Sequence, residues 1–143
     1  MKRLALGILL LSLVNISVPA QDNLSAKDDA AMVSATVKDY IEAYYTGDAR
    51  RMEQTLHPHY LKHMIHRTIP MREMTGLQIL RIVRTNGSAN IPQAERTEQV
   101  SVLDVAGNIA SAKLVTPHWV DYLTLSKTER GWKILSVVQR IDN

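Results

Sequence analysis

Residues 119–138, WVDYLTLSKTERGWKILSVV, decide the fold expected for this chain of 143 residues. Apolar and polar side chains largely alternate on both sides of Glu129-Arg130-Gly131, a short connection typical of a β-hairpin. Segments of this alternating kind, expected to be strands, lie at residues 96–105, 108–118, 119–127 and 132–141. Pro117 predicts a bend or bulge between the second and third of them, since proline donates no ladder hydrogen bond. The last third of the chain therefore predicts an antiparallel meander.

The residues before this meander carry helical periodicity. Between Ala26 and Tyr45, apolar side chains recur every three or four residues, which predicts a helix with one buried face. Gly47 is expected to cap the end of this helix. Asp48 is expected to cap the start of a short second helix that stops at Pro58.

A third helix is predicted further along. Thr75-Gly-Leu-Gln78 has the spacing of a capping box, and Asn86-Gly87 is expected to end the helix. Residues 60–71 are apolar at a few positions among basic residues and histidines, which indicates a strand or an irregular strand. Helices followed by a meander are the α+β order, so we expect a strongly bent sheet wrapped around a helix.

The first 20 residues are typical of a secretory signal peptide. A basic start, the uncharged stretch LALGILLLSLV and a small-residue site at Val18-Pro19-Ala20 occur in the expected order. An uncleaved membrane anchor is the alternative, but the stretch is short against the roughly 20 residues that span a bilayer. Cleavage after Ala20 would leave a loose leader at 21–26 and a single domain at 27–143. We therefore expect a periplasmic or secreted protein with no stable membrane insertion after cleavage.

Composition limits the partners and cofactors that we expect. The chain has 17 basic and 14 acidic residues, and loss of Lys2 and Arg3 with the signal leaves 15 basic against 14 acidic. Because no run of like charges occurs, the sequence predicts no nucleic-acid partner. It has no cysteine and no phosphate loop, nucleophile elbow or dinucleotide fingerprint, so we expect no disulfide framework and no cofactor.

Two stretches together resemble a known family. YIEAYYTGDARRMEQTLHPHYLKH at 40–63 and the hairpin at 119–138 look like the putative lumazine-binding proteins of the nuclear-transport-factor-2-like superfamily. That superfamily also contains ketosteroid isomerases, scytalone dehydratase and SnoaL-like polyketide cyclases, and the likeness covers about residues 27–141. The resemblance implies a cone: a strongly curved antiparallel sheet closed by three helices, with a pocket at the open end and a homodimer formed through the sheet. One fold hosts unrelated functions, so we infer no lumazine binding from the likeness.

The pocket can be sought from strand parity. If Leu123 and Leu125 face the core, then Trp119 and Asp121 lie on the same face, nearer the mouth of the cone. Burial beside an aromatic wall would raise the pKa of Asp121 and suit it to proton transfer. As an alternative, Asp121 caps the neighbouring strand or pairs with an arginine, Arg72 or Arg140, in a structural role.

Other side chains are candidates for the same pocket. His57 follows the short helix in a Leu-His-Pro step, where its ring could cap helix carbonyls or reach the pocket. Tyr40 and Tyr44 lie one helical turn apart and point inward, as core residues or as the polar floor of a pocket. The expected catalytic residues are Asp121 and His57, and the expected ligand-binding residues are Tyr40, Tyr44, Trp119, Asp121 and His57.

The histidines of HPHYLKHMIHR at 57–67 offer a competing site. His59 and His63 have helical spacing, but Pro58 favours a strand, in which the rings of His57, His59, His63 and His66 do not converge. A catalytic zinc site usually has three protein ligands, and no His-Glu-x-x-His pattern is present. We therefore expect no metal site, and the roles of His59, His63 and His66 stay open.

The sequence favours an exported protein that binds a small molecule of unknown identity in a partly apolar pocket without a cofactor. One alternative is a pocket enzyme of isomerase, dehydratase or cyclase type that uses Asp121 for general acid/base chemistry. The other is a dimeric interaction protein with a vestigial pocket. Whether the protein is an enzyme is left open by the sequence.

Overall fold

The computed structural model describes residues 20–85 and 87–141, with side chains from Ser25 onward. Its helices are α1 (Ala20–Thr46), α2 (Ala49–Thr55), α3 (Gly76–Arg84) and the short 3-10 helix η1 (Gln93–Glu95). Its strands are β1 (Leu56–Ile65), β2 (Arg72–Thr75), β3 (Gln99–Ala106), β4 (Ile109–Val115), β5 (Trp119–Thr128) and β6 (Gly131–Ile141). The expected α+β class is confirmed.

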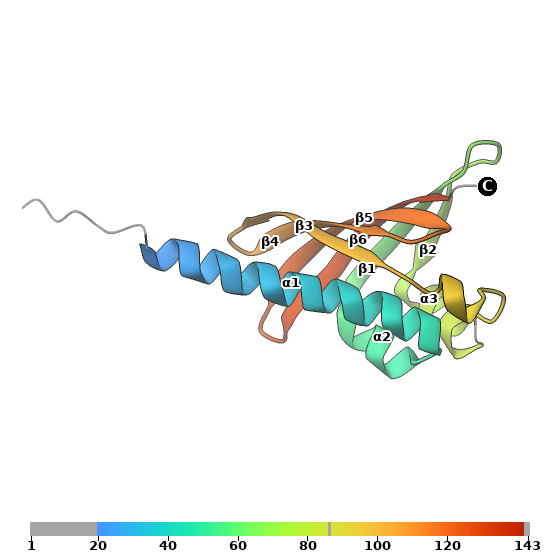
Figure 1. Ribbon diagram of the computed structural model, residues 1–143, viewed down its shortest axis with the longest axis horizontal. Helices are drawn as coiled ribbons and strands as arrows, with labels where there is room; N and C mark the ends of the chain where they lie inside the picture. The colour runs from blue at the N-terminus through green and yellow to red at the C-terminus, as the bar shows by residue number, and fades with distance from the viewer. Residues whose placement is uncertain (1–19, 86, 142–143) are drawn as a thin grey trace, which may run out of the picture.

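The strands form one curved sheet in the order β2-β1-β6-β5-β4-β3. Figure 1 shows α1 running along one face of this sheet, with α2 and α3 near the C-terminal end of α1. The meander from β3 to β6 is antiparallel as expected, but β1 pairs with β6 in the parallel direction. The expectation of a purely antiparallel sheet was therefore wrong. No tight turn joins β1 to β6, so nothing local in the sequence sets their relative direction.

The helix ends follow the sequence signals, with one shift. Gly47 has a φ of 72°, the left-handed conformation expected after α1, and the Asp48 side chain accepts a hydrogen bond from the amide of Arg51. Helix α2 already ends at Thr55, so Pro58 lies inside β1 and does not stop the helix. The pairing of β1 with β6 shifts register between Leu56 and Leu61, where proline is tolerated.

The third helix begins as predicted and ends earlier. The Thr75 side chain accepts from the amide of Gln78, and the Gln78 side chain accepts from the amide of Thr75, which completes the capping box. Helix α3 ends at Arg84, before the expected stop at residues 86–87.

Helix α1 is longer than the sequence pattern predicts. It begins at Ala20 and includes residues 21–26, for which we expected a loose leader. The reason is that these residues contain no proline or glycine that would end a helix. The remainder of the expected signal peptide lies outside the described residues, so its cleavage stays a prediction. Among residues 20–85 and 87–141, no helix is both long enough and apolar enough to cross a membrane.

The core lies between α1 and the inner face of the sheet. Val33, Val37 and Ile41 of α1 are at most 1% exposed, and they pack with inward residues of β4, β5 and β6. Leu123 and Leu125 are both buried, which confirms the predicted parity of β5. Burial of each such side chain contributes about 1.5–3 kcal/mol to folding, so the apolar face of α1 fixes its position on the sheet.

The N-terminal part of α1 is tied to the hairpin of β5 and β6 by a charged pair. The Trp132 indole Nε1 donates to Asp29 Oδ1 at 3.0 Å, and Lys127 Nζ lies 2.7 Å from the same oxygen. These contacts lower the pKa of Asp29, with the hydrogen bond from Lys127 contributing most and that from Trp132 next. Asp29 therefore anchors α1 as a fully partnered carboxylate.

Candidate functional site

Two hollows of different character occur among the described residues. The larger is an open groove of about 1310 Å³ between α2, the start of β1, the start of α3 and the turn after β5. The smaller, of about 220 Å³, lies between the C-terminal part of α1, α3 and the sheet. We place the candidate site in the smaller cavity because buried titratable side chains converge there, whereas the groove is lined mainly by side chains open to water.

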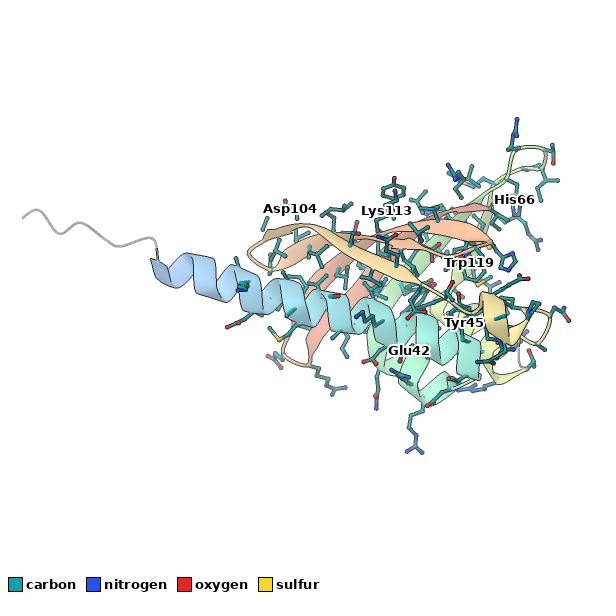
Figure 2. All side chains as sticks on the ribbon, viewed as in Figure 1. Glu42, Tyr45, His66, Asp104, Lys113 and Trp119 are labelled. Carbon is teal, nitrogen blue, oxygen red and sulfur yellow. The ribbon has the colours of Figure 1, made fainter. Side chains whose placement is uncertain are left out.

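The walls of the cavity divide by chemistry. Apolar side chains come from α1, β1, β2, α3 and β6, and they are Ile41, Met64, Met74, Ile79, Ile82 and Ile141. Polar side chains come from α1, β1, β5 and β6, and they are Tyr40, Tyr44, Lys62, Trp119, Asp121 and Gln139. Figure 2 shows Trp119 at the end of the sheet that lies over the C-terminal end of α1. The cavity is therefore a mostly apolar space with a polar cluster on one side.

Asp121 is the most enclosed charged group of the cavity. Its side chain is fully buried, and Oδ2 lies 3.5 Å from Lys62 Nζ. Within the described part of the chain, neither carboxylate oxygen accepts a hydrogen bond of good geometry. Burial raises the pKa of Asp121, and the nearby Lys62 opposes this, with smaller opposing contributions from Gln139 and Trp119. A carboxyl whose pKa is raised in this way is suited to general acid/base chemistry.

Lys62 connects Asp121 to a pair of phenols. Its Nζ donates to the hydroxyl of Tyr40 at 3.3 Å, and that hydroxyl lies 3.1 Å from the hydroxyl of Tyr60. Burial lowers the pKa of Lys62, while the charge of Asp121 acts in the opposite direction. Burial also raises the pKa of both phenols, so they stay neutral and can donate. The cavity therefore has a continuous polar chain from carboxyl to amine to two hydroxyls.

Trp119 and Tyr44 lie where the cavity opens. Their rings meet edge to face with centroids 5.8 Å apart, a favourable aromatic geometry. The indole Nε1 of Trp119 is buried and, among the described residues, has no hydrogen-bond partner. The indole donor of Trp119 and the carboxylate acceptors of Asp121 thus lie at the same cavity, and none of them has a hydrogen bond of good geometry among the described residues.

Comparison with known families and structures agrees with this architecture. The model of a family described as putative lumazine-binding matches residues 28–139. The chain belongs to this family. No curated protein matches the chain at a significant level.

Solved structures with similar folds have low sequence identity to this family member. An NTF2-like protein of unknown function from Silicibacter pomeroyi has a TM-score of 0.64 and 18% identity, covering 86% of this chain and 98% of that chain. A ketosteroid isomerase-like protein from Erwinia carotovora atroseptica has a TM-score of 0.60 and 10% identity, covering 81% and 98%. A putative dehydratase of the NTF2-like family from Streptomyces avermitilis has a TM-score of 0.56 and 17% identity, covering 82% and 98%. These likenesses show an NTF2-like fold.

The structure brings together four of the five side chains expected in the pocket of this putative lumazine-binding family member. Tyr40, Tyr44, Trp119 and Asp121 all line the cavity. His57 does not, because it lines the open groove, where its Nδ1 accepts from the amide of His59 at 3.1 Å. The expected cooperation of His57 with Asp121 is therefore contradicted by geometry. The buried residues of β1 are Tyr60 and Lys62, whereas His57 lies within the register shift between Leu56 and Leu61.

Sequence reasoning missed the partner of Asp121. We weighed Arg72 and Arg140, but the ion pair that forms is with Lys62. A signal was present, since Lys62 lies two residues from Tyr60 and from Met64 and thus shares the inward parity of both. Lysine side chains are rarely buried, so a lysine that alternates with inward apolar residues of a strand is not normally expected to face the core.

The remaining histidines do not build a common site. His63 Nε2 lies 3.1 Å from Glu73 Oε1 across the pair of β1 and β2, and His66 follows β1 at the base of the projecting hairpin (Figures 1 and 2). In residues 20–85 and 87–141, no three His, Cys, Asp or Glu side chains are grouped so that they could hold a metal ion.

Proposed function

We propose that this chain is an exported protein that binds a small, partly apolar molecule in the cavity beside Asp121. The observation that carries the proposal is a buried carboxylate that, among the described residues, accepts no hydrogen bond of good geometry, at a cavity that also holds a buried indole N–H without such a bond. Leaving such groups without partners costs about 1–3 kcal/mol each, so a ligand that pairs them gains binding free energy. The N-terminal sequence supports export, and the family description supports a small-molecule ligand.

The size and walls of the cavity limit the ligand. A volume of about 220 Å³ is below the roughly 300–1,000 Å³ of pockets for drug-sized molecules, which favours a small compound. Isoleucine and methionine side chains on α3, β1 and β2 suit an apolar body, while Asp121 and Trp119 suit a polar edge with a donor and an acceptor.

The test is to analyse compounds that copurify with the protein from cells. Met74 lines the cavity, so Met74→Trp should fill it, whereas the side chain of Leu77, which lines the groove, is 82% exposed and Leu77→Trp is the matched control. Mass spectrometry of the denatured samples should find one compound with the wild-type protein and with Leu77→Trp, but not with Met74→Trp. A compound lost only with Leu77→Trp would move the site to the groove, and no compound in any sample would contradict the proposal.

A second function, acid/base catalysis, is favoured by the polar chain from Asp121 through Lys62 to Tyr40. In this hypothesis Asp121 removes a proton from the carbon next to a carbonyl group. The phenol of Tyr40 or the amine of Lys62 stabilises the negative charge that develops on the carbonyl oxygen, as an isomerase or dehydratase requires. The two similar structures described as ketosteroid isomerase-like and as a putative dehydratase agree with this class of reaction.

This second function can be tested without knowing the substrate. Cyclopentanone in heavy water exchanges its α-protons slowly, and NMR should show faster exchange with the wild-type protein than with Asp121→Asn. General acid/base groups typically contribute about 10²–10⁴-fold, so the loss should be large. Equal exchange rates with both proteins would reject catalysis of this kind.

A third hypothesis, that the chain is an interaction protein, is favoured by exposed apolar side chains on the outer face of the sheet. Tyr122 and Val138 are neighbours across β5 and β6, and they are 51% and 43% exposed. Figure 2 shows Lys113 on the same side, away from α1. Because exposed apolar pairs on a sheet suit a partner surface, we propose a homodimer through this face. Light scattering should give a dimer for the wild-type protein and for Leu77→Glu, and a monomer for Tyr122→Glu; a wild-type monomer would reject it.

A further inference from the structure

Lys62 has an environment that no other described lysine shares. It is 6% exposed, whereas every other lysine of residues 25–85 and 87–141 is exposed or half-buried. Its side chain is one of those that line the cavity, and its amine contacts two other lining residues, Asp121 and Tyr40. A primary amine is therefore presented to whatever occupies that space.

The surroundings of Lys62 favour an uncharged amine. Isoleucine and methionine make up half of the residues that line the cavity, and low polarity penalises an ammonium ion. Burial lowers the pKa of Lys62 and raises the pKa of Asp121, and both shifts favour the uncharged form of the group. An uncharged amine has a free electron pair and is a nucleophile.

The groups that could move protons for this amine lie next to it. Asp121 Oδ2 is 3.5 Å from Nζ, and the Tyr40 hydroxyl is 3.3 Å from Nζ on another side. The Tyr60 hydroxyl, 3.1 Å from that of Tyr40, extends the relay. Nucleophile, acid and hydrogen-bond donor therefore meet at one end of a closed space, which is the arrangement that nucleophilic catalysis needs.

We propose that Lys62 forms a reversible imine with the carbonyl carbon of a small, partly apolar aldehyde or ketone bound in the cavity. This inference rests on the proposed function, since it assigns a ligand class and a covalent step to the same cavity. Apolar walls would hold the body of the ligand, and the polar chain of Asp121 and Tyr40 would hold its oxygen.

The step balances without an oxidant or a reductant. The Nζ electron pair forms the new C–N bond while protonated Asp121 gives its proton to the carbonyl oxygen, and the carboxylate then takes a proton from nitrogen. The resulting carbinolamine loses its hydroxyl as water when Asp121 donates again, and Asp121 recovers the last nitrogen proton. The products are one imine and one water molecule from one amine and one carbonyl compound.

The test uses the full chain, benzaldehyde as the probe and sodium cyanoborohydride, which reduces an imine to a stable amine. Peptide mapping by mass spectrometry then compares Lys62 with the more open lysines Lys113, Lys127 and Lys133 of the same sample. Lys62 should carry about tenfold more adduct than any of these, because the cavity holds the carbonyl carbon beside its amine. Equal or lower labelling of Lys62 would overturn the proposal.

Variants separate reactivity from general exposure. The variant Lys62→Arg should lose the excess benzaldehyde adduct expected at residue 62. The matched control Lys133→Arg should still form this adduct on Lys62. Asp121→Asn should slow the labelling of Lys62, since the acid that protonates the carbonyl oxygen is gone. If Lys62→Arg does not fold, the comparison of lysines within the wild-type protein still decides the outcome.

The proposal and the function on which it rests fail in different ways. A copurified compound that disappears with Met74→Trp, together with no excess adduct on Lys62, would leave small-molecule binding standing and remove the imine. Excess adduct on Lys62 that persists in Met74→Trp would place the reactive amine outside the cavity and overturn the imine at this site.

Discussion

Two lysine–aspartate pairs lie under the same sheet and differ in almost every physical respect. At one end Asp29 is held by Lys127 at 2.7 Å and by the Trp132 indole at 3.0 Å, and the Lys127 side chain is 43% exposed. At the other end Asp121 lies 3.5 Å from Lys62, with side chains that are 0% and 7% exposed. The first carboxylate is fully partnered, and the second has no hydrogen bond of good geometry among the described residues.

The difference shows how one pair of residue types produces either an anchor or a site. Contacts lower the pKa of Asp29, whereas burial raises the pKa of Asp121. The anchor therefore keeps its charge and fixes α1 to the hairpin, while Asp121 is left poised to bind or exchange a proton.

The sharpest way to test this contrast is to remove each lysine. Lys62→Met should cost about 1–3 kcal/mol in the free energy of unfolding, because it leaves the buried carboxyl of Asp121 without the amine that lies beside it. The double variant Lys62→Met/Asp121→Leu should recover most of that loss. Lys127→Met should cost less than Lys62→Met, since water reaches the Lys127 side chain.

Urea unfolding at neutral pH measures all three variants. Equal costs for Lys62→Met and Lys127→Met would mean that the two pairs are alike, and the contrast would be lost.

The side chains of Trp132, next to Asp29, and Trp119, next to Asp121, extend the comparison of the two carboxyls, with a smaller expected effect on stability. Trp132→Phe should destabilise the protein by about 1–3 kcal/mol, since it reduces a core side chain and removes the donor to Asp29. Trp119→Phe should change the stability by less than about 1 kcal/mol, because the edge contact with Tyr44 can persist and no hydrogen bond is lost. Thermal unfolding of both variants checks this order, and the reverse order would contradict the assignment of anchor and site.

The pH dependence of stability should have opposite signs at the two carboxyls. The folded-state pKa of Asp121 is above 3.8, so its contribution to stability is complete below 3.8 and is lost as the pH rises through the folded-state value. The pKa of Asp29 is below 3.8, so its contribution is present above 3.8 and is lost as the pH falls through the folded-state value.

Asn variants isolate these slopes. The free energy of unfolding of the wild-type protein, minus that of Asp121→Asn, should fall as the pH rises above 3.8. The same difference taken with Asp29→Asn should fall as the pH drops below 3.8. Urea unfolding over a series of acidic pH values provides both curves. Slopes of the same sign would show that the two carboxyls share one environment.

The smallest expected effect concerns His57. Because His57 lines the groove and not the cavity, His57→Ala should leave both the copurified compound and the labelling of Lys62 unchanged. The free energy of unfolding of His57→Ala should differ from that of the wild-type protein by no more than about 0.5 kcal/mol, as for most substitutions at partly exposed positions. Loss of the compound in His57→Ala would connect the two hollows and would restore His57 as a site residue.

Local signals predicted much of the fold. Gly47, Asp48 and the Thr75 capping box each act through bonds within a few residues, and each was found where its pattern indicated. Strand parity likewise placed Asp121 beside Leu123 on the inner face, because alternation is a property of the single strand.

Non-local pairing could not be predicted in the same way. The parallel pairing of β1 with β6 joins segments separated by most of the domain, and it turns Lys62 towards Asp121 and leaves His57 in the groove. Neither the direction of that pairing nor its register shift near Pro58 has a local cause in the sequence.

The sequence by itself therefore determined the three main helices, the caps at Gly47, Asp48 and Thr75 and the inward position of Asp121, since each depends on backbone hydrogen bonding and side-chain parity within one segment. Only the tertiary structure decided which partner Asp121 has. Contact between Lys62 and Asp121 requires β1, β6 and β5 to lie side by side, and the apolar side chains of α1 and α3 to close the space above them. Burial, and with it the shifted pKa of both groups, exists only once those elements exclude water together.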